Sequence, residues 1–528
     1  MTGTGRLIRL ILRRDRFIMP IWVFVLGILP AAYVTTIEGL FSTDAERLDY
    51  ALISRTNAGF VALYGQLRGD SVAEMAIWRA GFVPVLLGVF VALTVIRHTR
   101  ADEEAGRTEL IGAGVVGRRA PLAAALITTM AACLVLGMIT TLGLIGQDLP
   151  VAGSVWSGVE LTVAGWAFAG VAAVAAQLTG SARGARSIAI LAVGLAYVLR
   201  LGGDLSAMSD GPLSWLSWVS PIGWVQHIYP YGAADWWPAA LTVLFAAAAT
   251  AAGVVLLGHR DLGAGLFPGR PGPATAARSL RTPLALAWRL HRGLLIGWAA
   301  AFAALGLVFG AVGQSVADIG SGTAMGDIFA RMGGSEVMVN SYFASIAGMV
   351  GIIAACYAVQ ATLRMRDEET AGHAEMILTA AATRRGWAAS HLFFSLLGPA
   401  VLLLLEGLIS GAAYGAITGD NVLGDVLAGA VTQLPAVWTL AGVAALLAGV
   451  LPRWSALAWG AVSICLLVLL VGTTLQLDQW LLDISPFTHV PHLPGGELSW
   501  TPLVTLTVVA AALVAAGLAT LRRRDIPA

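Results

Sequence analysis

The sequence predicts an all-α polytopic membrane protein with twelve transmembrane helices, and three observations carry this prediction. Hydrophobic residues make up 57% of the 528 residues and charged residues only 12%, which is typical of chains embedded in a bilayer. The apolar residues form continuous runs of roughly 20 residues, the length that a helix needs to cross the hydrocarbon core, and lack the alternation of barrel strands. A charged stretch, Arg97–Arg119, comes again at Arg364–Arg385, which indicates a duplicated chain.

The chain begins with a cationic segment. Arginines recur at spacings of three and four from Arg6 to Arg16, and apolar residues between Leu7 and Leu12 take much of the other side of a helical wheel. We therefore predict an amphipathic helix that lies in the cytoplasmic membrane interface. The alternative is a positively charged flank of the first span.

Six spans follow in each half of the chain. The first half is residues 1–262 and the second is residues 283–528, joined by a Pro/Gly-rich cytoplasmic linker at residues 263–282. We place the twelve spans near residues 17–37, 77–96, 121–145, 158–178, 187–203, 238–258, 294–315, 343–363, 392–417, 428–450, 455–475 and 502–521.

The arginines predict the orientation of these spans. Twelve spans put both termini on the same side, and the segments on that side hold 26 of the 32 basic residues. The positive-inside rule then predicts a multi-pass protein of the bacterial cytoplasmic membrane with both termini in the cytoplasm. Because each half begins and ends inside, the two six-helix repeats are parallel, related by an axis along the membrane normal.

The repeated charged stretch is a cytoplasmic loop between the second and third span of each half. A constant shift of 266 residues pairs its members without a gap: Arg100 with Arg366, Asp102 with Glu368, Glu103 with Glu369, Gly106 with Gly372 and Glu109 with Glu375. Outside the loop, Ser220-Pro221 comes again as Ser485-Pro486 before the last span of each half. Two equivalent loops that do the same job are therefore expected.

All 32 basic residues are arginine, so the chain contains no lysine. A P-loop needs its lysine to reach the β- and γ-phosphates of ATP. We therefore expect no ordinary P-loop ATPase in this chain, and any ATP hydrolysis must come from another subunit. The net charge of +1 gives no indication of a nucleic-acid partner.

This set of features resembles the permease subunits of type V ABC exporters: six spans per half, an amphipathic N-terminal helix, a charged loop after the second span and a broken Ser-Pro segment before the last. The double length, the sequence EEAGRTE at residues 103–109 and the lack of an ATPase domain resemble the actinobacterial exporters of polyketide antibiotics, of the tetronasin-transport type. The resemblance implies outward transport of amphipathic compounds, including antibiotics, by alternating access. It also implies a separate ATP-binding subunit, as a homodimer, that binds Mg-ATP, with no cofactor in this chain.

In such exporters the first cytoplasmic loop of each half is similar to a coupling helix that docks on the ATPase. Carried over to this sequence, the resemblance implies coupling roles for Glu103, Glu104, Gly106, Arg107 and Glu109 in the first half, and for Glu369, Gly372, His373 and Glu375 in the second.

The residues themselves fit a docking role. Glu103 and Arg107 are spaced as an i,i+4 pair, which predicts a short surface helix. Acidic groups on a cytoplasmic face favour a partner of complementary charge, and the alternative is a solvated loop held by its own ion pairs. Since His373 replaces Arg107 and Thr370 replaces Glu104, we expect two docking sites of unequal strength.

The resemblance implies a substrate path between the halves. Aromatic and flexible apolar side chains suit amphipathic compounds, and the candidates are Trp22, Phe24, Phe90, Trp298, Phe302, Phe309, Met349 and Tyr357. Glu406, alone within the apolar ninth span, is a further candidate, because an ionisable residue there is a functional hypothesis by default. The alternatives are aromatic residues that face lipid and a protonated, hydrogen-bonded Glu406.

Two other classes of protein remain open. An ion-driven secondary transporter of the major-facilitator type also has twelve spans, but its corresponding loop is typically basic. A membrane-embedded lipid-linked transferase would need catalytic groups in the external loops, where no carboxylate cluster stands out, and we predict no catalytic residues. His227, His489 and His492 lack a carboxylate or cysteine that would complete a tetrahedral set, so we predict no metal site.

Overall fold

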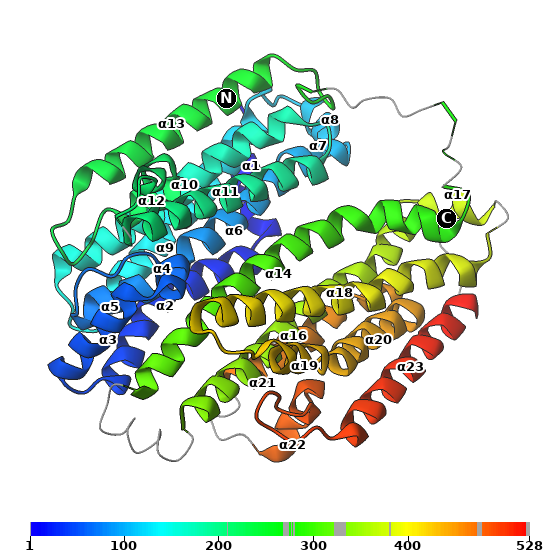
Figure 1. Ribbon diagram of the computed structural model, residues 1–528. Helices are drawn as coiled ribbons and strands as arrows, with labels where there is room; N and C mark the ends of the chain where they lie inside the picture. Colours follow the sequence, from blue (N-terminus) through cyan, green and yellow to red (C-terminus); the bar gives the residue numbers. More distant parts are fainter. Residues whose placement is uncertain are drawn as a thin grey trace. The chain divides into compact units, whose positions relative to one another are not determined.

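The computed structural model describes residues 2–208, 210–267, 274–275, 277, 280–321, 334–379, 382–471 and 478–523. All the regular elements in these residues are helices (Figure 1), which confirms the all-α prediction. The chain divides into two compact units, residues 1–272 and 273–528, and we describe each by itself. The boundary falls within the predicted linker, much of which lies outside the described residues, and the domain limits stay a prediction.

Unit 1 contains thirteen described α-helices and one 3-10 helix. In chain order these are α1 Thr4–Arg14, α2 Ile18–Leu40, α3 Asp44–Thr56, α4 Ala58–Tyr64, α5 Val72–Arg79, α6 Val83–Arg97, α7 Arg100–Glu104, α8 Arg107–Gly112, α9 Ala120–Ile145, α10 Val151–Leu178, α11 Ala182–Met208, η1 Ser214–Val219, α12 Pro221–Gln226 and α13 Trp236–Gly258.

Unit 2, like unit 1, consists of long helices joined by short ones. Its described helices are α14 Pro283–Ser321, α16 Gly334–Thr370, α17 His373–Leu378, α18 Arg384–Thr418, α19 Leu423–Val431, α20 Leu434–Val450, η3 Pro452–Trp454, α21 Leu457–Val471, α22 Gln479–Leu482, η4 Pro486–His489 and α23 Trp500–Arg523.

Eleven helical stretches among the described residues are long and apolar enough to cross a membrane. They correspond to eleven of the twelve predicted spans. The exception is the span predicted at residues 455–475, where the apolar part of α21 is Leu457–Leu469, shorter than a spanning helix needs. Residues 472–477 lie outside the described residues, so the count of twelve stays a prediction.

The second predicted span, residues 77–96, begins too early. The helix is interrupted between α5 and α6, at residues 80–82, where the carbonyls of Ala76 and Trp78 accept the last hydrogen bonds of α5. Apolar residues continue through the break, which is why hydropathy alone did not reveal it. The spanning stretch starts at Val83, and α5 belongs to the preceding helical segment.

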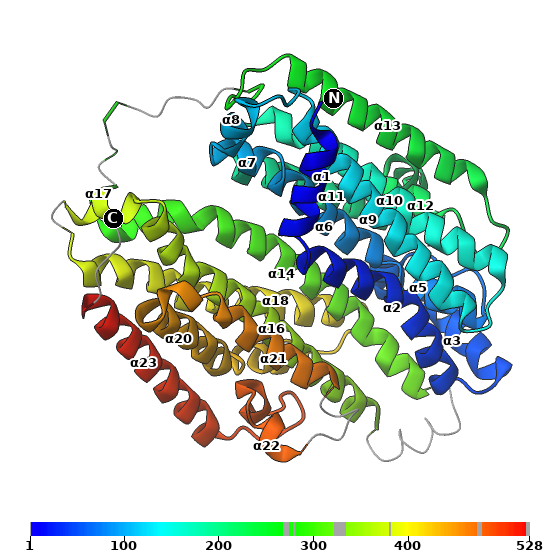
Figure 2. The same cartoon turned by 180° about the vertical axis from the view of Figure 1, so that it is seen from behind.

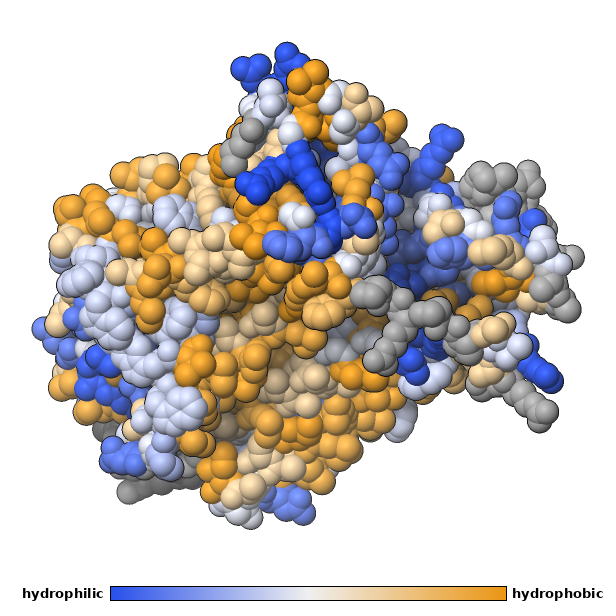
Figure 3. All heavy atoms as spheres, turned by 90° about the horizontal axis from the view of Figure 1, so that it is seen from above, coloured by the Kyte–Doolittle hydropathy of each residue, from blue (hydrophilic) through white to orange (hydrophobic). Residues whose placement is uncertain are grey.

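Large apolar side chains are exposed along the long helices. Leu244 on α13 is 67% exposed and Leu191 on α11 is 71% exposed. Figure 3 shows broad hydrophobic areas on the visible face. Apolar surface of this extent is unfavourable in water but suits contact with lipid chains.

Helix α10 forms the core of unit 1. It packs against α6, α9, α11 and α13, and most of its spanning part is buried. Small residues allow this close approach: a Cβ on Gly170 would lie 2.8 Å from Cβ of Ala249 on α13. Helix α1 packs on α9 with Leu7 and Ile11 buried, and lies beside it in Figure 2, so its predicted amphipathic character is confirmed.

Unit 2 has a core of similar construction. Helix α14 packs on α18, and α20 packs on α23 and α16. One hydrogen bond occurs in both units: the indole nitrogen of Trp166 donates to the carbonyl of Met130 at 3.0 Å, and that of Trp438 donates to the carbonyl of Leu396 at 2.9 Å. The units therefore share local structure beyond the charged loops.

The repeated Ser-Pro pairs begin short helices in both units. The hydroxyl of Ser220 accepts from the backbone N–H of Ile222 and of Gly223, and Pro221 starts α12. The hydroxyl of Ser485 accepts from the N–H of Phe487, and Pro486 starts η4. Proline is favoured at this first position because it has no N–H to leave unsatisfied, so this repeated motif is an N-terminal cap.

Candidate functional site

The repeated charged stretch folds into the same short helical corner in both units. In unit 1, α7 ends, Gly106 takes a left-handed conformation with φ of 70°, and α8 begins at Arg107. In unit 2, Gly372 has φ of 74° and α17 begins at His373. The 266-residue shift maps α8 onto α17 from end to end. A side chain is strained at such φ values, which accounts for glycine at both positions.

Two ion pairs fix this corner in each unit, at equivalent positions. Across the glycine, Arg107 pairs with Asp102 at 2.7 Å, and His373 pairs with Glu368 at 3.0 Å. Before the glycine, Arg100 pairs with Glu103 at 3.3 Å and Arg366 pairs with Glu369 at 2.8 Å.

The predicted i,i+4 pair between Glu103 and Arg107 is wrong. The left-handed Gly106 ends the helix between them, so i,i+4 spacing no longer places two residues on one face. Arg107 pairs with Asp102 instead. Glu103 points inward, with its side chain only 7% exposed.

Glu103 connects the corner to the end of α13 by an ion pair and hydrogen bonds. Its two carboxylate oxygens accept from the Arg260 guanidinium at 2.6 and 2.7 Å, and the backbone N–H of Gly263 donates to it at 2.6 Å. Arg260 also donates to the side chain of Gln177 on α10 at 2.8 Å. Bidentate, charge-assisted pairs of this kind are strong and geometrically specific.

Other contacts tie the same corner to three more helices. Glu104 accepts from the backbone N–H of Ala182, the first residue of α11, at 2.8 Å. Arg100, fully buried, donates to the carbonyl of Ala176 on α10 at 2.8 Å. Asp102 pairs with Arg14 of α1 at 2.7 Å. The corner in unit 1 is therefore connected by charged hydrogen bonds to α1, α10, α11 and the end of α13.

An acidic and an apolar side chain are left exposed on each short helix. On α8 Glu109 is exposed and Leu110 is 81% exposed, and on α17 Glu375 is exposed and Met376 is 67% exposed. Glu375 and Met376 are the equivalents of Glu109 and Leu110 under the shift of 266. Single exposed apolar side chains are common on protein surfaces, so the distinguishing feature of this pair is that it occurs at equivalent positions of both corners.

The structure thus places the nine predicted coupling residues in different settings. Arg107, Glu109, His373 and Glu375 are exposed, and Gly106 and Gly372 set the backbone between the helices. The side chains of Glu103 and Glu369 are inside. Glu104 is exposed and accepts a hydrogen bond from the backbone of α11. Sequence reasoning missed Arg14 and Arg260, which hold the corner, and missed Leu110 and Met376, which the 266-residue shift could have identified.

The candidate pathway residues of unit 1 lie on α2 and α6. Trp22 is buried at 4% exposure and stacks on Phe90, with ring centroids 6.1 Å apart. Phe24 is 58% exposed. The structure brings Trp22 and Phe90 together but does not place Phe24 with them.

The candidates of unit 2 lie mostly in its core. Trp298 lies 6.1 Å from Phe302 and 6.2 Å from Tyr357 between ring centroids. Phe302 and Tyr357 are fully buried and Phe309 is 8% exposed. Met349 packs at the edge of the same cluster. These side chains contribute to packing within unit 2.

Glu406 is buried in α18 at 2% exposure, and its Oε1 has no hydrogen-bond partner among the described residues. Its helix lies against α14, where a Cβ on Gly306 would lie 2.8 Å from the Glu406 carbonyl. An unpaired carboxyl group inside a span is costly, so the prediction that Glu406 has a functional role stays open.

The histidines considered for a metal lie in different units, His227 in unit 1 and His489 and His492 in unit 2. The ring of His227 is tilted against that of Trp218, with centroids 4.0 Å apart, and His489 forms a hydrogen bond with the carbonyl of Asp483 at 3.0 Å. His492 is exposed. Within the described ranges, three or more His, Cys, Asp or Glu side chains never lie close enough to hold a metal ion.

Comparison with known proteins identifies the family. A family model described as "Multidrug efflux system permease Rv1217c, C-terminal domain" matches residues 8–257 and 280–522, one stretch in each unit. The chain is also 42% identical to the multidrug efflux system permease protein Rv1217c of Mycobacterium tuberculosis, over 99% of this chain and 95% of that protein. With its apolar helices, this match makes the chain a multi-pass membrane protein, and it belongs to the Rv1217c family of multidrug efflux permeases.

Proposed function

We propose that this chain is the complete transmembrane subunit of an ATP-driven exporter that moves amphipathic compounds, antibiotics among them, out of the cell. A separate ATPase, as a homodimer, supplies the Mg-ATP chemistry and docks on α8 and α17. The relative in Mycobacterium tuberculosis is named a multidrug efflux permease, which supports the choice of substrate class. The absence of lysine from the sequence supports a motor on another chain.

One observation carries the proposal. Helices α8 and α17 have equal length, follow the same left-handed glycine, and expose the same pair of side-chain types, Glu109 with Leu110 and Glu375 with Met376. A homodimeric partner has two equivalent surfaces, and two matched corners suit such a partner.

The internal bonds of the first corner supply a mechanical link. Since Glu103, Glu104, Arg100 and Asp102 tie the corner to α13, α11, α10 and α1, a force on α8 reaches the ends of four helices at once. Closure of the ATPase around ATP would then move these helices as a group, which is the step that alternating access requires.

The finer architecture belongs to the same proposal. We place twelve spans in two parallel six-helix repeats in the bacterial cytoplasmic membrane, with α1 in the cytoplasmic interface and both termini inside. Within the Rv1217c family we assign the chain to the tetronasin-transport type. The substrate path runs between the halves, near Trp22, Phe90 and Trp298, and Glu406 is a candidate contact for its polar groups.

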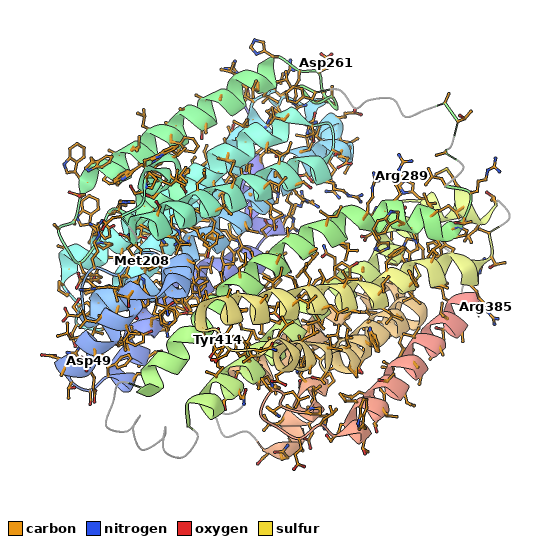
Figure 4. All side chains as sticks on the ribbon, viewed as in Figure 1. Asp49, Met208, Asp261, Arg289, Arg385 and Tyr414 are labelled. Carbon is orange, nitrogen blue, oxygen red and sulfur yellow. The ribbon has the colours of Figure 1, made fainter. Side chains whose placement is uncertain are left out.

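The docking test uses residues that are exposed, because reversing the charge of the buried Glu103 would damage the corner itself. We expect the double variant Glu109→Arg, Leu110→Asp to lose co-purification with the cognate ATPase and drug export, at least about tenfold. It should still insert in the membrane at the wild-type level. Asp49→Arg is the matched control, since Asp49 is an exposed acid at the opposite end of unit 1 from Asp261 and the corner (Figure 4).

Unchanged ATPase binding and unchanged export in the double variant would overturn the docking proposal.

The energy source of transport has its own test in proteoliposomes. Export that stops with vanadate and survives a protonophore supports the ATP-driven exporter, and the opposite pattern would assign the chain to the secondary transporters.

A further inference from the structure

Unit 1 contains a polar cavity at the end of α10 remote from the charged corner. Its volume is about 350 Å³, within the usual range of small-molecule sites. Residues between α4 and α5, α5 itself, the end of α11 and the segment after α12 line it. The exposed Arg68 and Asp235 form its rim, and the buried Trp78 and Glu160 form its floor. Met208, four residues after the lining Asp204, marks this end of unit 1 in Figure 4.

Glu160 is the unusual residue of this cavity. It is 6% exposed, and the described residues provide no hydrogen bond or ion pair to its carboxylate. It lies nine residues after the start of α10 and eighteen before its end, about 14 and 27 Å along the helix axis. A buried carboxyl group without a partner is costly within a span, so the cavity is where its partner would have to be.

The arginines near the cavity already have contacts with other residues. Arg200 is fully buried, donates to the carbonyls of Val61 and Ala62 at 3.0 Å each, and pairs with the lining Asp204 at 3.4 Å. The Arg68 guanidinium lies 3.4 Å above the ring of Tyr229, which also lines the cavity. Of the four lining carboxyl groups, those of Glu74, Glu160, Asp204 and Asp235, Asp204 therefore has a cation, and the described residues provide none for Glu160.

The other polar side chains of the cavity are held uncharged. Burial lowers the pKa of His227, and burial raises the pKa of Tyr229 to about 12. Both groups are therefore neutral near pH 7. The indole nitrogen of Trp78 donates to the carbonyl of Gly65 at 2.7 Å, which holds that ring on the floor. Aromatic rings beside carboxylates form the type of site that attracts organic cations.

We propose that this cavity binds a small organic cation, with an ammonium or guanidinium group against Glu160 and an apolar body beside Trp78 and Tyr229. If α10 is laid end to end on Leu423–Val450, which is also 28 residues long, Glu160 falls on Thr432. The equivalent helix of unit 2 therefore lacks this carboxyl group. The proposed site does not depend on how transport is powered.

The test measures binding to the purified full chain in lipid nanodiscs, without an ATPase. Benzyltrimethylammonium is the probe, and neopentylbenzene, which has carbon in place of the charged nitrogen, is its neutral isostere. We expect saturable calorimetric binding of the cation in wild type and a loss of at least tenfold in Glu160→Gln, which keeps the shape of the side chain. The variant should also lose the preference for the cation over the isostere, a readout that general misfolding does not produce.

Two further variants complete the experiment. Asp235→Asn, on the exposed rim, should weaken cation binding by about two- to threefold, and Asp49→Asn, exposed and outside the cavity, should leave it unchanged. Equal binding of the cation by wild type and Glu160→Gln, or no saturable binding to wild type, would overturn the proposal. Because no ATPase is present, neither result bears on the docking of α8 and α17.

Discussion

The charged corner of unit 1 and its equivalent in unit 2 turn at the same left-handed glycine but are bridged differently. In both corners the glutamate before the glycine pairs with the arginine three residues earlier, Glu103 with Arg100 and Glu369 with Arg366. In unit 1, Glu103 also reaches Arg260, 157 residues further along the chain, and that pair is almost completely buried. Across the glycine, an arginine in one corner stands where the other has a histidine. The bridge across the glycine is therefore the contact in which the two corners differ by residue type.

The largest expected effect comes from the buried pair of the first corner. Glu103→Gln leaves Arg260 and Arg100 buried without compensation, and we expect a loss of about 3–5 kcal/mol in the free energy of unfolding. Denaturant titration of the purified variant and of wild type measures the loss. Adding Arg260→Met to Glu103→Gln should recover part of it, and a loss below about 1 kcal/mol in Glu103→Gln would contradict the role of this buried pair.

A smaller effect is expected from exchanging the basic residue that pairs across the glycine, Arg107 in the first corner and His373 in the second. An arginine is always charged, whereas His373 pairs with Glu368 as an ion only when it holds a proton. His373→Arg should stabilise the second corner by about 0.3–1 kcal/mol, and Arg107→His should weaken the first by a similar amount. Hydrogen exchange at the backbone amides of α8 and α17 measures both changes in local stability. If His373→Arg has no effect on α17, the histidine is not what makes the corners unequal.

The smallest effect concerns the repeated Ser-Pro segments. His227 is partly buried, whereas His492 at the equivalent place is exposed. Burial lowers the pKa of His227 from 6.5, so the stability it contributes is present above pH 6.5 and is lost as the pH falls below that value. We expect wild type to lose about 0.5 kcal/mol or less between pH 7.5 and 5.5 relative to His227→Gln. The pH profiles of thermal unfolding of wild type and His227→Gln measure this difference, and identical profiles would contradict it.

Continuous apolar runs were enough to predict the helical fold, because each spanning helix satisfies its own backbone hydrogen bonds and needs only length and hydrophobicity. Breaks within those runs were not predictable in the same way. The interruption between α5 and α6 and the short apolar part of α21 lie in sequence that remains hydrophobic. Their positions depend on local hydrogen bonding and packing, which hydropathy does not report.

For the candidate site, the sequence repeat located the correct segment, but it did not show which of its glutamates are buried. The shift of 266 residues located α8 and α17 and both left-handed glycines. It could not indicate that Glu103 turns inward, because its partner Arg260 is far away in the sequence. Glu160 could have been noticed: it is a lone carboxyl group in an apolar run, the same signal that selected Glu406.

The bonds that hold the first corner have a consequence for how this chain can be cut. Arg14, Arg100, Glu103, Ala182, Arg260 and Gly263 all lie in unit 1, which ends at residue 272. The corner in unit 1 therefore draws every one of these supports from its own half. A polypeptide that ends at residue 272, expressed together with the rest of the chain, would keep all of these bonds, which makes the permease a candidate for split-gene assays in which the halves are mutated and titrated separately.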